Sequence, residues 1–172
     1  MSYRAIVAIL ALILGAPALA DTIAVIGTGD VGGALGPEFA AQGHTIVYGS
    51  RDPQRGKVKE LVEKTGDLAS ATTPAEAAAQ ADIVVLARPG LMVEEITKSL
   101  GDLSGKIIID PTNPLERRMN RPEHAVDTSN AEIIQAAAPG AYVVKASLLY
   151  TSPSPRDPLR YLVCRLLLEN TG

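Results

Sequence analysis

The chain has 172 residues, enough for one domain that buries its own core. Hydrophobic residues make up 47% of it and aromatic residues only 3%, which is typical of close-packed layers of helix and sheet. The net charge of −3 argues against a basic nucleic-acid-binding surface, so we expect no nucleic acid partner. The single cysteine, Cys164, excludes an internal disulfide and a cysteine-based metal cluster, and we predict no metal site.

The first 20 residues have the pattern of a secretory leader. Arg4 provides a positive start, residues 5–15 are an apolar run too short to span a bilayer, and Ala18 and Ala20 flank a small-residue cleavage site. We therefore expect cleavage before Asp21, no stable membrane span afterwards, and a periplasmic or secreted location. The alternative is an uncleaved membrane anchor or an incidental helix.

A short apolar strand at residues 22–26 runs directly into a glycine-rich turn. Gly27, Gly29 and Gly32 have the spacing G-x-G-x-x-G, and residues 34–42 continue as a predicted helix. In this pattern the first glycine allows a tight turn, the second lets the backbone approach a pyrophosphate, and the third lets helix and strand pack closely. The helix N-terminus then offers free N–H groups to phosphate. The turn predicts dinucleotide binding, although glycine-rich turns also occur without a ligand.

The second predicted strand, at residues 45–48, ends in a segment that bears on the choice of dinucleotide. NAD-binding proteins usually carry an acidic residue at this strand end for the ribose hydroxyls, whereas this chain has Ser50 and Arg51. A hydroxyl and a guanidinium suit a 2′-phosphate, and Arg55 and Lys57 add positive charge. We therefore predict NADP(H). The alternative is that Arg51 is a solvated turn residue. The next residue, Asp52, could be mistaken for the acidic ribose ligand.

The rest of the chain alternates helices with strands. We predict helices at 54–65, 74–80, 92–100 and 130–138, strands within 68–71 and at 83–86, 106–109 and 142–145, and a surface loop at 116–128. Two capping boxes, Thr73 with Glu76 and Ser129 with Glu132, mark helix starts. This order predicts an α/β fold with a doubly wound parallel sheet and helices on both faces, a Rossmann fold.

Four segments resemble the NADPH-dependent coenzyme F420 reductase family. They are Ile-Gly-Thr-Gly-Asp-Val-Gly-Gly-Ala-Leu, Gly-His-Thr-Ile-Val-Tyr-Gly-Ser-Arg-Asp-Pro, Ala-Asp-Ile-Val-Val-Leu-Ala and Ile-Asp-Pro-Thr-Asn-Pro-Leu. The resemblance extends over residues 22–146 and implies hydride transfer between NADPH and a deazaflavin (F420) or flavin. It also implies a further C-terminal substrate domain, which we expect to be missing here, leaving this chain inactive. The sequence leaves open whether the protein forms a homo-oligomer.

The resemblance also implies which residues bind the cofactor. Thr28 to Val31 would hold the pyrophosphate, Ser50 and Arg51 the 2′-phosphate, and residues 87–89 with Asn113 and Pro114 the nicotinamide side. The full set of predicted cofactor-binding residues is Gly27, Thr28, Gly29, Asp30, Val31, Gly32, Ser50, Arg51, Arg55, Ala87, Arg88, Pro89, Asn113 and Pro114. The chain departs from the family pattern at Arg88, where a small apolar residue is common, and at Gly90, where a bulky one is.

The sequence indicates no catalytic acid–base pair or nucleophile. His44 and His124 lack a partner pattern, so a structural or solvated role is expected for both. Hydride transfer can rely on positioning the cofactor against its acceptor, so this does not argue against an oxidoreductase. The alternative is a non-catalytic NADP-binding module, such as a redox sensor or a subunit of a larger reductase.

The C-terminal segment 147–172 differs in character from the rest. Residues 148–157 match the in-frame translation of a transposase-based sequencing adapter, and residues 161–169 match its flow-cell end. The alternative is a proline-rich linker followed by an amphipathic segment. We expect a leader at 1–20, an NADP-binding domain at 21–146 and an artefactual tail at 147–172.

Overall fold

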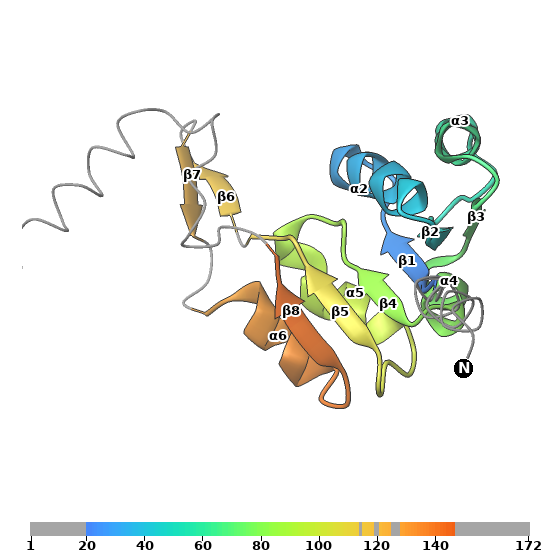
Figure 1. Cartoon of the computed structure of the whole chain (residues 1–172). Helices are drawn as coiled ribbons and strands as arrows, with labels where there is room; N and C mark the ends of the chain where they lie inside the picture. Colours follow the sequence, from blue (N-terminus) through green and yellow to red (C-terminus); the bar gives the residue numbers. More distant parts are fainter. Residues whose placement is uncertain (1–19, 114, 119–120, 125–127, 147–172) are drawn as a thin grey trace, which may run out of the picture.

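The computed structural model of the protein describes residues 20–113, 115–118, 121–124 and 128–146. Six strands form one parallel sheet in the order β3-β2-β1-β4-β5-β8 (Figure 1). They are β1 (Thr22–Ile26), β2 (Thr45–Gly49), β3 (Ala69–Thr72), β4 (Ile83–Val85), β5 (Ile107–Asp110) and β8 (Tyr142–Lys145). The helices are α2 (Asp30–Ala41), α3 (Gly56–Thr65), α4 (Pro74–Gln80), α5 (Val93–Ser99) and α6 (Asn130–Ala137), with the short 3-10 helix η1 (Gly90–Met92).

The helices lie on both faces of the sheet, which confirms the predicted doubly wound α/β fold (Figure 1). On one face, strand residues such as Val84 and Ile108 pack with residues of α4, α5 and α6, among them Ala77 and Ile134. On the other face, buried residues of β1 and β2 pack against Leu35 and Phe39 of α2 and Leu61 of α3. The order reverses beside β1, so β1 and β4 flank the crevice where open α/β sheets bind ligands.

One buried tyrosine joins β2 to both helices on its face. Tyr48 is fully buried, and its hydroxyl lies 2.7 Å from the Thr65 hydroxyl of α3. A Cβ atom at Gly36 of α2 would meet that tyrosine hydroxyl, so glycine is required there. Thr65 donates its own proton to the Leu61 carbonyl oxygen, so Tyr48 acts as donor in the pair. Burial raises the pKa of Tyr48, although the hydrogen bond to Thr65 acts the other way.

Both predicted capping boxes are present. Thr73 accepts a hydrogen bond from the backbone N–H of Glu76 at the start of α4, and the Glu76 carboxylate accepts one from the N–H of Thr73. Ser129 and Glu132 make the same reciprocal pair at the start of α6. The hydrogen bond from Thr72 is the main reason that the pKa of Glu76 lies below its ordinary value. These caps place the starts of α4 and α6 where the sequence predicted them.

The largest difference from prediction is at residues 116–128, where the predicted surface loop is wrong. Strands β6 (Leu115–Arg118) and β7 (Arg121–His124) pair antiparallel there and lie apart from the main sheet (Figure 1). Polar residues dominate both strands, so the alternation of apolar residues that marks a half-buried strand is missing. Other differences are boundary shifts, the largest being that α2 begins at Asp30 rather than residue 34.

Several expectations lie outside the described residues. They concern the predicted leader except Ala20, residue Pro114 and the predicted tail at 147–172. Among the described residues, no helix is both long enough and apolar enough to cross a membrane.

Candidate functional site

The glycine turn follows β1 directly, and two of its glycines are needed by the fold itself. Gly27 has a φ of +115°, and a Cβ there would meet the carbonyl oxygen of Ala87. A Cβ at Gly32 would meet the carbonyl oxygen of Gly27 and lie 3.1 Å from Val25. The tight turn and the close approach of helix to strand, predicted from the spacing, are therefore both present.

Gly29 is different, because nothing in the described part of the chain requires it to be glycine. Its φ of −86° and ψ of −160° are extended and open to any residue. A Cβ built on Gly29 would meet no atom within 4 Å. Gly29 is also the N-cap of α2, where the first N–H groups of the helix lack intrahelical partners. The missing side chain therefore leaves open space in front of a helix N-terminus, a place suited to phosphate.

A cationic cavity of about 380 Å³ lies beside this turn, at the carboxyl end of β2. Its lining contains four basic side chains and one acidic one. The lining residues are Thr28, Ser50, Arg51, Asp52, Arg55, Lys57, Val58 and Arg88. Such an excess of positive charge favours an anionic group, and guanidinium groups suit phosphate in particular.

The backbone at this cavity is held by the sheet on both sides. The carbonyl oxygen of Gly49 accepts a hydrogen bond from the N–H of Gly27 at 3.0 Å, and the N–H of Ser50 donates to Thr72 at 2.9 Å. The Asp52 carboxylate accepts from the N–H of Gln54 at 3.1 Å, so it stabilises its own turn. Asp52 also lines the cavity, as its one acidic side chain.

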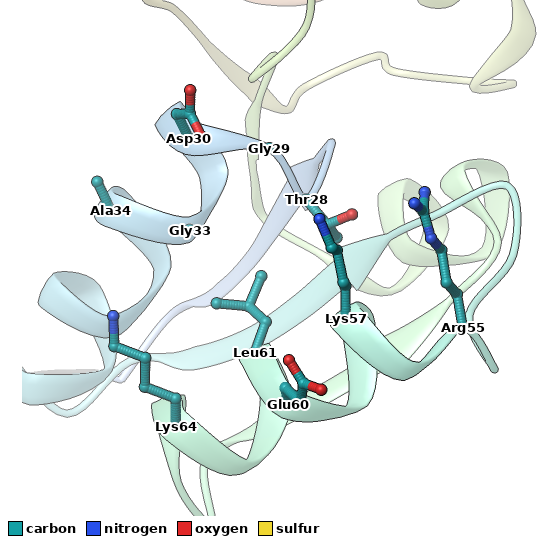
Figure 2. A pocket seen from close by; sticks show the side chains of 10 residues that line it. All are labelled: Thr28, Gly29, Asp30, Gly33, Ala34, Arg55, Lys57, Glu60, Leu61 and Lys64. Carbon is teal, nitrogen blue, oxygen red and sulfur yellow. The ribbon is translucent and has the colours of Figure 1, made fainter.

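Two further cavities adjoin the cationic one. The larger, of about 760 Å³, lies between α2 and α3 and shares Thr28, Arg55 and Lys57 with it. Figure 2 shows Lys57, Leu61 and Lys64 on α3 facing the turn and α2. The smaller, of about 170 Å³, shares Arg51 and Arg88 with the cationic cavity. Its other lining residues are Ile26, Gly49, Pro74, Met92, Glu95, Ile96 and Ser99.

A buried polar network lies across the ends of β4, β5 and β8. The fully buried Asp110 carboxylate accepts hydrogen bonds from the N–H and hydroxyl of Thr112 at 2.9 and 2.6 Å and an ion pair from Lys145 at 3.0 Å. The Asn130 amide, also fully buried, donates to the Thr112 hydroxyl at 2.7 Å and to the Gly90 carbonyl at 3.0 Å. Sequence reasoning missed this network because its members are far apart in the chain.

Ten of the fourteen predicted site residues fall into two groups around the turn, whereas Ala87 and Pro89 follow β4, Asn113 follows β5, and none of these three lines the cavities described above. Gly27 to Gly32 form the turn and the first turn of α2, where Val31 is exposed. The other group lines the cationic cavity and consists of Ser50, Arg51, Arg55 and Arg88. Arg88, which was expected on the nicotinamide side, thus faces the cavity at the end of β2. Sequence reasoning had not found Lys64 of α3, or Met92 and Ile96 beyond β4, because no motif marks them.

The two histidines and the metal prediction can be checked only in part. His44 accepts a hydrogen bond from the N–H of Asp21 at 3.3 Å, at the end of the sheet opposite the glycine turn, which fits a structural role. The prediction that His124 lies in a loop is wrong, because it belongs to β7. Within the described ranges, no group of three or more His, Cys, Asp or Glu side chains could hold a metal ion.

Known proteins resemble this chain over half of its length or more. The sequence profile of the family described as "NADP oxidoreductase coenzyme F420-dependent" matches residues 22–114. The F420-dependent NADP reductase of Methanothermobacter thermautotrophicus is 38% identical over 102 residues, which are 55% of this chain and 44% of that protein. Metalloreductase STEAP3 of Rattus norvegicus is 30% identical over 158 residues, 89% of this chain and 30% of that protein.

A solved structure agrees with these matches. A protein of Arthrobacter sp. FB24, provisionally named an F420-dependent NADP reductase, superposes with a TM-score of 0.64 and 32% identity, over 72% of this chain and 60% of that one. The chain thus spans less than half of either sequence relative. The glycine turn, the strand order and these matches agree, and the chain belongs to the family of F420-dependent NADP oxidoreductases.

Proposed function

We propose that this domain binds NADP(H), in preference to NAD(H), across the carboxyl edge of the sheet and presents it for hydride transfer to a deazaflavin or flavin. One observation carries the proposal. At the end of β2, where NAD-binding proteins usually carry an acidic residue, Arg51, Arg55, Lys57 and Arg88 surround one cavity together with Ser50. A 2′-phosphate distinguishes NADP from NAD, and this cavity supplies the charge that such a group needs.

The residues present fit the rest of the dinucleotide. The open space at Gly29, in front of the α2 N-terminus, suits the pyrophosphate. The neighbouring small cavity has apolar walls from Ile26, Met92 and Ile96, and Arg51 and Arg88 lie at its border with the cationic cavity. An adenine base could bury its faces on such walls and stack on a guanidinium.

The bound cofactor would supply the hydride, which leaves the nicotinamide ring with two electrons for the acceptor. The protein's own contribution is to bind and orient. The turn and the cationic cavity fix the cofactor at β1 and β2, so the nicotinamide half lies over the ends of β4 and β5, because those strands follow β1 in the sheet. Catalysis of this kind rests on positioning the cofactor against its acceptor.

The cofactor preference is tested by titrating NADPH and NADH into the protein and into Arg51→Glu. We expect tighter binding of NADPH, and loss of most of that preference in the variant, by about 1.5–3 kcal/mol for a charge-assisted contact. Lys59→Glu is the matched control, because Lys59 is an exposed residue of α3 outside the cationic cavity. Equal affinity of the unaltered protein for both cofactors would overturn the proposal.

The redox part is tested in a longer chain, because this one spans 44% of the F420-dependent NADP reductase of Methanothermobacter thermautotrophicus. A fusion that adds the unmatched part of that reductase after residue 146 should oxidise NADPH with a deazaflavin as the hydride acceptor. The reaction is measured as the decrease in NADPH absorbance. Tight NADPH binding without oxidation by any deazaflavin or flavin would favour the alternative, a non-catalytic NADP-binding module.

A further inference from the structure

We propose that Asn130 is a positioning residue that fixes the nicotinamide side of the site by holding Gly90 against Thr112. This proposal rests on the proposed binding of NADP(H). Gly90 follows the loop after β4, and Thr112 follows β5, so the two segments border the part of the sheet edge beyond the glycine turn. Asn130 itself is fully buried and would act only through these two neighbours.

The geometry gives Asn130 one donor group and two separate segments to hold. Its Nδ2 atom donates to the Gly90 carbonyl at 3.0 Å and to the Thr112 hydroxyl at 2.7 Å. The Thr112 hydroxyl donates its own proton to the Asp110 carboxylate at 2.6 Å, so it must accept from Asn130. The amide orientation is therefore fixed, since a flipped amide would aim its oxygen at the Gly90 carbonyl oxygen.

The Asp110 carboxylate anchors the far end of this chain of hydrogen bonds. Lys145 of β8 pairs with it at 3.0 Å and also donates to the carbonyl oxygen of Thr112. β5 is thus tied to β8 by the ion pair, and Thr112 after β5 is tied to β8 by the hydrogen bond from Lys145 and to α6 by Asn130. A buried, nearly fully satisfied network of this kind resists displacement of any one member.

The loop at Gly90 lies so close to the segment after β5 and to Asn130 that there is no room for a side chain at this position. A Cβ atom at Gly90 would meet the carbonyl oxygen of Asn113 and lie 2.8 Å from Nδ2 of Asn130. The Oδ1 atom of Asn130 is buried without a hydrogen-bond partner among the described groups, so the contacts of this amide with Gly90 and Thr112 are made by Nδ2 alone. We infer that loss of the Nδ2 contacts lets the loop after β4 move away from the segment after β5.

Two ligands separate this role from a general loss of structure. NADPH spans the whole edge, whereas adenosine 2′,5′-bisphosphate carries the 2′-phosphate but lacks the nicotinamide half. In Asn130→Ala we expect the Kd for NADPH to rise about tenfold, the effect of about 1.4 kcal/mol, while the Kd for the bisphosphate stays within about twofold. Both are measured by calorimetric titration, beside a thermal melt of each variant.

A second pair of variants keeps the test valid if Asn130→Ala does not fold. Thr112→Val removes the hydroxyl that accepts from Asn130 and keeps the shape of the side chain, whereas Thr112→Ser keeps the hydroxyl. Of these two variants, Thr112→Val should raise the Kd for NADPH relative to the Kd for the bisphosphate, whereas Thr112→Ser should leave this ratio unchanged. Equal weakening of both ligands, or unchanged ratios in all variants, would overturn the proposal. Failure of the unaltered protein to bind either ligand would instead overturn the proposed function, and this proposal with it.

Discussion

Gly29→Val is the sharpest test of the phosphate site, because the structure predicts opposite effects on folding and on binding. The backbone at Gly29 is extended, with φ −86° and ψ −160°, so valine meets no backbone strain. A Cβ there has no neighbour within 4 Å among the described residues, so the added side chain meets none of their atoms at its first carbon. The variant should fold as the parent does.

The stability effect can be estimated from two opposing contributions. Replacing a glycine in an unstrained conformation reduces the entropy of the unfolded chain and stabilises by about 0.4–1 kcal/mol. Glycine is a better N-cap residue than valine, so the start of α2 loses about 0.5–1 kcal/mol. The two nearly cancel, and the free energy of unfolding should change by less than about 0.5 kcal/mol, measured by urea denaturation.

Binding should respond very differently. The valine side chain occupies the space in front of the α2 N-terminus, so the pyrophosphate would lose about two charge-assisted hydrogen bonds, at about 1.5–3 kcal/mol each. NADPH affinity should fall at least about 100-fold. Gly32→Val is the matched control, because its Cβ would meet the Gly27 carbonyl oxygen and destabilise the fold itself. Unchanged NADPH affinity in a folded Gly29→Val protein would refute the placement of the phosphates.

Two further predictions concern stability. Tyr48→Phe should lower the free energy of unfolding by about 1 kcal/mol at neutral pH, because the hydrogen bond to Thr65 is lost. Burial raises the pKa of Tyr48 in the folded protein above its ordinary value of 10.0, so the parent should keep this advantage below about pH 10 and lose it as the pH rises further. Urea unfolding of both proteins at neutral pH and above pH 10 measures the difference. Lys145→Met should lower the free energy of unfolding by about 3 kcal/mol, because the buried Asp110 carboxylate loses its ion-pair partner. Lys98→Met is the control: Lys98 pairs with Glu94 at the surface, so its loss should leave the free energy of unfolding nearly unchanged. Equal effects of the two lysine variants would contradict this prediction.

Local signals in the sequence were sufficient for most of the main sheet. The glycine spacing, the two capping boxes and the apolar runs predicted β1, α4 and β8 with the bounds that the structure has. The hairpin of β6 and β7 gave no such signal, because neither strand alternates apolar with polar residues. The predicted start of α2 was four residues too late, because glycine has a low helix propensity and the turn is rich in glycine.

The candidate site was predicted where its residues are close in the chain and missed where they are not. Ser50 and Arg51 were found because they follow a strand, and the structure adds Arg88 from beyond β4 to the same cavity. The contact between Asn130 and Gly90 joins residues 40 positions apart, so no local pattern could indicate it. Contacts of this kind depend on the order of the strands in the sheet, which short sequence motifs do not specify.

The anchoring of Tyr48 has a consequence for how cofactor preference can evolve. Tyr48 is locked between Gly36 and Thr65, and the backbone of the next two residues is bonded to Gly27 on one side and to Thr72 on the other. The Ser50 hydroxyl contributes to the same turn, because it donates to the Asp52 carbonyl oxygen at 3.1 Å and accepts from the Asp52 N–H at 3.3 Å. A different side chain at Arg51 would therefore change the charge of the cavity while the main chain that carries it stays held in place.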